Sequence, residues 1–173
     1  MSQHLYLPTV WHTGTHVLAD KVVKWEELRR EGWIVHKQHT NQEWRYPNDY
    51  PGLVLSSLRH PRRVRASWKA RGVGNDSTFN TQFDNLIRIW SPWVKQWLIV
   101  DQPGLREWQV QKIGELLDKP LYYDFNIVNA ESGSNKGLHA VPLENCPEVP
   151  QVYIDFYEEI LNASKEAQLQ ARV

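Results

Sequence analysis

Blocks of apolar residues alternate with amphipathic blocks along the chain. The apolar blocks at residues 4–10, 33–37, 52–58 and 97–100 have the length and β-branched content of short strands. The third of them, GLVLSSL at 52–58, is apolar enough for a central strand. The pattern therefore predicts at least four strands separated by other elements.

Helical spacing of apolar residues occupies the intervals between these strands. We expect helices at residues 15–30, from Pro61 to near Gly72, and then at 79–90, 103–118 and 149–170. The glycine-rich segment 72–78 predicts a loop.

Strands and helices that alternate in this way favour a three-layer α/β/α sandwich with a central parallel sheet. The 173 residues suit a single domain. Ligands of such folds bind beyond the carboxyl ends of the strands, near the point where strand order reverses. Residues 11–15, 37–39 and 59–61 follow predicted strands and are the first places to search for a site.

Composition narrows the class of protein. With 41% hydrophobic and 23% charged residues the chain is typical of a folded globule, and its apolar runs are too short to cross a membrane. It shows no secretory signal, and Cys146 is its single cysteine. We therefore expect a cytoplasmic protein that binds no membrane.

Charge is balanced overall, with 20 basic and 20 acidic residues, but one stretch is purely basic. It contains Arg59, Arg62, Arg63, Arg65, Lys69 and Arg71. A local positive field within a neutral chain indicates a compact anionic ligand rather than a long polyanion.

The first junction, Trp11-His12-Thr13-Gly14-Thr15-His16, follows a predicted strand and opens a predicted helix. Successive backbone amides and a helix dipole at such a place form an anion cradle, to which the threonine hydroxyls are able to donate. The segment is no Walker A loop, because Thr9 and Thr15 stand where that motif needs glycine and lysine. A plain capped helix start is the structural alternative.

The second junction delivers Arg59 to the end of an apolar strand, and the helix opened by Pro61 places Ser67 about two turns further on. A guanidinium is always charged and binds phosphate with two parallel hydrogen bonds. The alternative is a solvated basic helix face.

The third junction carries Lys37 and His39, which point to the same side of an extended segment. A histidine near neutral pKa is able to take a proton from a hydroxyl, and a lysine neutralises charge on a transferring group. A surface pair without function is the alternative.

These three elements, taken in order over about residues 5–121, resemble the sulfotransferase family. Arg59, Pro61 and Ser67 match the family's R-N-P-x-D-x-x-x-S motif for the 3′-phosphate, and Thr13-Gly14-Thr15 is similar to its 5′-phosphosulfate loop, P-K-S-G-T-T. Lys37-Gln38-His39 looks like its K-T-H segment. The resemblance implies a P-loop NTPase-like fold and 3′-phosphoadenosine-5′-phosphosulfate (PAPS) as co-substrate.

The resemblance also implies roles for individual residues. Arg59 and Ser67 hold the 3′-phosphate, the 5′-phosphosulfate lies on Thr13, Gly14, Thr15 and His16, and His39 is the base for an acceptor hydroxyl on a small molecule or glycan. Lys37 or His12 stabilises the charge on the bridging oxygen, and no metal is required. Lys136 and Gly137 resemble part of the family's R-K-G contact with the 3′-phosphate.

The chain departs from the family at several positions. His12 replaces the loop lysine, Arg63 replaces the aspartate of the 3′-phosphate motif, and Val17 replaces a tryptophan that packs on adenine. Trp11 and Trp68 are the candidates to hold the base instead. The arginine of the R-K-G contact is Asn135 here.

Other functions stay open on the sequence alone. One is a P-loop nucleotide kinase whose motif has degenerated; another is a non-catalytic nucleotide- or nucleic-acid-binding module that uses the basic helix 59–71. A sulfotransferase fold that binds without catalysing is a further alternative, because of His12. Neutral overall charge makes nucleic acid the less favoured partner.

Overall fold

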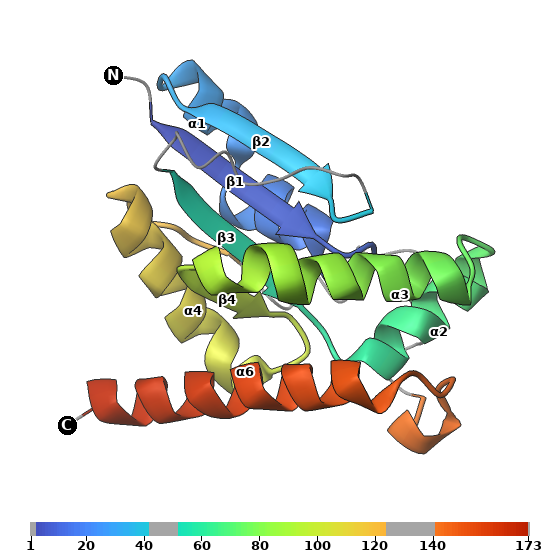
Figure 1. Ribbon diagram of the computed structural model, residues 1–173. Coiled ribbons are helices and arrows are strands. Elements are labelled where there is room, and N and C mark those ends of the chain that lie inside the picture. Colours follow the sequence, from blue (N-terminus) through green and yellow to red (C-terminus); the bar gives the residue numbers. More distant parts are fainter. Residues whose placement is uncertain (1–2, 42–51, 124–140, 173) are drawn as a thin grey trace.

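A parallel sheet forms the centre of the protein. The computed structural model describes residues 3–41, 52–123 and 141–172 (Figure 1). The sheet has the order β2-β1-β3-β4, and every strand pair is parallel. Its strands are β1 (His4–Thr9), β2 (Ile34–His39), β3 (Leu53–Leu58) and β4 (Gln96–Ile99). The predicted α/β class is confirmed.

The remaining elements surround this sheet. The longer helices are α2 (Pro61–Arg71), α3 (Asp76–Asn85), α4 (Pro103–Leu117) and α6 (Gln151–Ala171). The shorter ones are η1 (Val17–Val22), α1 (Trp25–Arg30), η2 (Leu86–Trp90), η3 (Ser91–Trp93) and η5 (Leu143–Asn145). No helix in the three described segments is long and apolar enough to span a membrane.

Each face of the sheet has its own apolar core, because successive residues of a strand point to opposite faces. Leu5 and Leu7 of β1 pack with Leu28 of α1 and Ile113 of α4. Tyr6, between them, belongs to the opposite cluster, which includes residues of α2, α3, η2 and α6. Helices thus cover both faces, as the predicted three-layer sandwich requires.

The helix predicted at residues 15–30 is wrong as a continuous element. Val23 N donates to Leu18 O, a wide turn in which both Val22 and Val23 are fully buried. Lys24 then adopts a left-handed conformation with φ 53°, and α1 begins at Trp25. The wide turn and the left-handed Lys24 divide the predicted helix into η1 and α1.

The loop predicted at residues 72–78 is also too long. Helix α3 begins at Asp76, three residues before the predicted start at Phe79, because the side chain of Asn75 caps it. Asn75 Oδ1 accepts from Thr78 N at 2.8 Å. An asparagine at this position was a readable N-cap signal within a segment that its glycines made resemble a loop.

The order of the strands locates the crevice of the fold. From β1 the chain crosses to the edge strand β2 and returns to β3 on the opposite side of β1. Strand order therefore reverses between β1 and β3, and their carboxyl ends flank the place where open α/β sheets bind ligands. The loop after β1 and the residues after β3 meet there.

Candidate anion-binding site at the ends of β1 and β3

The turn after β1 has a backbone that strongly favours glycine at position 14. Gly14 has φ +96°, and a Cβ built there would lie 2.4 Å from Cγ1 of Val100, the residue after β4. His12 is also left-handed, with φ 65°. Two left-handed residues fold the turn tightly against the end of β4, which keeps its amides close to the sheet.

Both threonine hydroxyls of this turn form hydrogen bonds within the protein. Thr13 Oγ1 donates to Val10 O at 2.7 Å, and Thr15 Oγ1 donates to Thr9 Oγ1 at 2.8 Å. Thr13 is fully buried, because β3 packs beside it and places Ser57 Oγ 3.3 Å away. These hydroxyls shape the turn.

The amides of Gly14, Thr15 and His16 remain for a ligand. Thr13 N donates to Val10 O, whereas none of the following three N–H groups has an acceptor among the described residues. The helix behind them, η1, has six residues, so its dipole is short and the amides themselves carry the positive potential. The predicted cradle is reduced to these three backbone groups.

Arg59, the residue after β3, is a buried cation, and two of its guanidinium nitrogens lack an acceptor among the described residues. It is 2% exposed, and within the described part of the chain its Nε and Nη2 have no acceptor. Burial lowers the pKa of its guanidinium, and Asp101 opposes that shift. Asp101 itself accepts from His60 N and from the Tyr157 hydroxyl, each at 2.9 Å.

Position 12 of the turn touches helix α2 directly. His12 Nδ1 and Ser67 Oγ lie 2.5 Å apart, and Ser67 is fully buried. The contact joins two motifs that are 55 residues apart in the sequence. We call His12, Arg59, Ser67 and the three amides of Gly14, Thr15 and His16 the anion site.

Positive charges near the anion site act on the His12 imidazole. Burial lowers the pKa of the His12 imidazole, and the positive charges of Arg71 and Arg59, followed by His39, lower it further. His12 is therefore neutral at pH 7, in surroundings of positive potential. A cluster of this kind attracts an anion.

His39 lies at the end of β2, on the rim of the same crevice. Its ring meets the indole of Trp11 edge-on, with centroids 5.6 Å apart. Burial lowers the pKa of His39; the backbone of Thr9 opposes this, and the charge of Lys37 adds to it. The ring is consequently unprotonated at neutral pH, as a general base must be.

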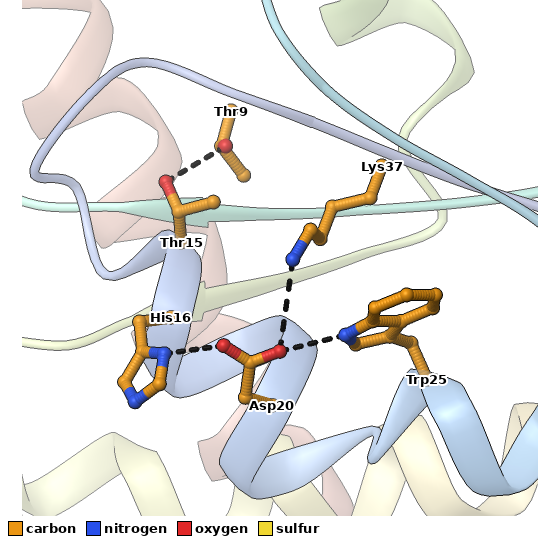
Figure 2. A network of polar contacts seen from close by, with 6 residues as sticks. All are labelled: Thr9, Thr15, His16, Asp20, Trp25 and Lys37. Atoms are coloured by element: carbon orange, nitrogen blue, oxygen red, sulfur yellow. Dashed lines mark hydrogen bonds and ion pairs between the residues drawn. The ribbon is translucent and has the colours of Figure 1, made fainter.

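The side chains of Lys37 and His16 both contact one carboxylate, that of Asp20. Figure 2 shows the side chains of His16, Lys37 and Trp25 converging on Asp20 of η1. Lys37 Nζ lies 3.7 Å from Asp20 Oδ1 and 4.8 Å from the centroid of the Trp25 ring. Although Lys37 and His39 are two residues apart, they contact different elements.

Most arginines of the basic stretch at residues 59–71 form hydrogen bonds or ion pairs within the protein. Arg62 donates to the carbonyl oxygens of Glu144, Cys146 and Pro147, and Arg65 Nη2 lies 2.8 Å from Asp76 Oδ1. Arg63 Nη1 donates to Val141 O. The structure leaves Lys69 and Arg71 as its exposed residues, so a broad phosphate-binding face is absent from the described helix α2.

The two tryptophans predicted to hold the adenine base differ in how far they are buried. Trp68 is fully buried, and its Nε1 donates to Trp11 O at 2.8 Å, which excludes it from stacking on a ligand. Trp11 is half-buried beside His39 and stays available. Lys136, Gly137 and Asn135 lie outside the described residues.

Two residues near the site had no role in the PAPS site predicted from the sequence. Gln82 of α3 is fully buried, and its Oε1 accepts from Trp11 N at 2.8 Å, which anchors the turn. The other is Arg71, whose positive charge lowers the pKa of His12. Its position four residues beyond Ser67, on the same face of a helix, was the signal available.

Searches with protein-family models, among curated proteins and among solved structures find no match to this chain.

Proposed function

We propose that the protein is a sulfotransferase that binds PAPS in the anion site and passes its sulfuryl group to a hydroxyl. The observation that carries this proposal is Arg59, a buried guanidinium with two unpartnered nitrogens at the switch point of the sheet. An unpaired buried charge is costly, and an anionic ligand would remove that cost. The turn at Gly14 lies on the adjacent strand, which supports a ligand with two anionic groups.

We include in this proposal that the fold is P-loop-like. The 3′-phosphate interacts with Arg59 and Ser67, and the 5′-phosphosulfate with the amides of Gly14, Thr15 and His16. The threonine side chains are left out of this assignment, since their hydroxyls donate within the turn.

His39 is the base of the proposed reaction. Its neutral imidazole takes the proton of the acceptor hydroxyl while the acceptor oxygen forms a bond to sulfur. The bond between sulfur and the bridging phosphate oxygen breaks, and adenosine 3′,5′-bisphosphate leaves. Charge on the bridging oxygen is met by His12 rather than Lys37, because the Lys37 ammonium is paired with Asp20.

The alternatives have less support. A kinase needs a lysine for the β- and γ-phosphates, and the turn 11–16 contains none. A nucleic-acid-binding surface needs free cations in a row, whereas Arg62 and Arg65 are occupied by carbonyl groups and by Asp76.

Calorimetry tests the binding half of the proposal. Adenosine 3′,5′-bisphosphate should bind the full chain, AMP should bind at least tenfold more weakly, and Arg59→Gln should abolish the difference. Lys69→Gln, an exposed change on the same helix, is the matched control and should bind normally. Equal affinity for the two nucleotides would refute a 3′-phosphate site.

Transfer is tested with PAPS labelled in the sulfuryl group and a set of hydroxyl acceptors: a phenol, a hexose and a tyrosine peptide. Labelled product should form with at least one acceptor. His39→Gln should reduce the rate at least 100-fold and leave bisphosphate affinity unchanged. A variant as active as the parent chain would exclude His39 as the base.

A further inference from the structure

Helix α2 presents one face to the turn after β1. Ser67 lies on this face, since its hydroxyl is 2.5 Å from His12 Nδ1. Arg63 and Arg71 lie four residues before and after Ser67, so they share its face. Arg63 is near Arg59, whose pKa it lowers, and Arg71 is near His12. The face thus runs from one part of the anion site to the other.

Arg71 is placed to move toward a ligand. It is the last residue of α2, and Gly72 with φ 64° turns the chain away directly after it. Its side chain is exposed and forms no ion pair with any described residue. Arg65, on another face of α2, is by contrast held by Asp76.

The anion site needs a permanent charge beside His12. Position 12 is where the resembling family has its loop lysine, and here it is a half-buried imidazole whose pKa is lowered by burial and by the charges of Arg71 and Arg59. A neutral imidazole donates at most one hydrogen bond, whereas a guanidinium keeps its charge at every working pH.

We infer that Arg71 supplies this missing charge and binds the anionic group that lies beside His12, while Arg59 binds the other group. The site is then specific for nucleotides that carry anionic groups at two separated positions, one at each guanidinium. This inference rests on the proposed function and adds Arg71 to it as a specificity-determining residue.

The position of Arg71 is tested without any ligand. The pKa of His12, followed by NMR of the imidazole, should rise in Arg71→Gln, because one of the charges that oppose its protonation is gone. Lys69→Gln removes the same charge two residues away and should leave the pKa of His12 unchanged. An equal pKa in all three proteins would overturn the placement.

Its role is tested by calorimetry with adenosine 3′,5′-bisphosphate at constant salt. Arg71→Gln should weaken binding about 10- to 100-fold, the value of a charge-assisted hydrogen bond, and Arg71→Lys should recover part of it. AMP, whose 5′-phosphate takes the place beside His12, should lose about the same factor, whereas 3′-AMP should be nearly unaffected. Circular dichroism should show an unchanged fold, since Arg71 is exposed.

The outcomes separate this inference from the proposed function. If Arg59→Gln abolishes binding and Arg71→Gln binds like the parent chain, the site stands and the inference about Arg71 is wrong. If the parent chain shows no preference for the bisphosphate, the proposed function fails, and the NMR result alone then decides where Arg71 lies.

Discussion

His12 Nδ1 lies 2.5 Å from Ser67 Oγ, and this contact joins the turn after β1 to helix α2. The turn is anchored from the other side as well, because Trp11 N donates to Gln82 of α3 at 2.8 Å. Both contacts connect segments distant in the sequence. They hold the turn in one position relative to Arg59, which is what a preorganised binding site needs.

Arg59→Met should stabilise the ligand-free protein while abolishing anion binding. Arg59 is 2% exposed with two unpartnered nitrogens, and an apolar side chain of similar length fills its space without a buried charge. We expect a gain of about 1–3 kcal/mol in the free energy of unfolding, measured by urea titration. Arg59→Ala, which leaves a cavity, is the control and should not be stabilised. A large loss of stability in Arg59→Met would mean that the charge is satisfied in the folded protein.

Gly14→Ala should be strongly destabilising. The added Cβ would meet Val100 Cγ1 at 2.4 Å on a residue with φ +96°, so backbone strain and steric overlap combine to about 2–4 kcal/mol. Gly32→Ala separates the two causes, because Gly32 has φ +101° but nothing within 4 Å of an added Cβ. Gly32→Ala should therefore lose only about 1–2 kcal/mol of the free energy of unfolding, which urea titration measures for both variants. Equal losses in the two variants would show that the contact with Val100 is relieved at no cost.

Stability should fall as the pH drops below about 6.5, the unfolded-state pKa of histidine. Burial is the first cause that lowers the pKa of each of four histidines: His12, His36, His39 and His60. A lowered pKa means that the unfolded chain binds protons first, so this stability is complete above pH 6.5 and is lost as the pH falls through the folded-state values. Urea titrations at pH 8 and pH 5.5 measure the difference.

His36→Phe checks that histidines cause the pH dependence. Phenylalanine can keep the ring stack on Tyr6, where the centroids are 4.4 Å apart, and it has no proton to gain. The variant should therefore lose less stability between the two pH values than the parent chain does. An identical pH dependence would place its origin elsewhere.

Asp20→Asn should loosen the network of Figure 2. The change removes the charge that pairs with Lys37 and His16 and keeps an oxygen for Trp25 Nε1, now 2.7 Å from Asp20 Oδ1. We expect a loss of about 1 kcal/mol in the free energy of unfolding. His16→Gln, at a side chain that is 72% exposed, should change it by less than about 0.5 kcal/mol. A loss as large as that of Asp20→Asn would make His16 the main partner of the carboxylate.

Local pattern predicted much of the architecture. The starts of α2 and α4 coincide with Pro61 and Pro103, and the core strands fall within one or two residues of their expected bounds. Errors arose where a tertiary contact overrode local preference. The left-handed Lys24 divided the first helix, and the cap at Asn75 began α3 inside an expected loop.

The order of apolar strands and amphipathic helices was enough to determine the α/β class. The spacing of Arg59, Pro61 and Ser67 predicts a binding site at the end of β3. Only the folded structure decided which donors a ligand can reach. It gave the hydroxyls of Thr13 and Thr15 partners within the turn and paired Lys37 with Asp20. It also left two nitrogens of the buried Arg59 guanidinium without an acceptor in the described part of the chain. Element type follows from short-range periodicity, whereas the direction and pairing of a side chain depend on residues that reach it from elsewhere in the chain.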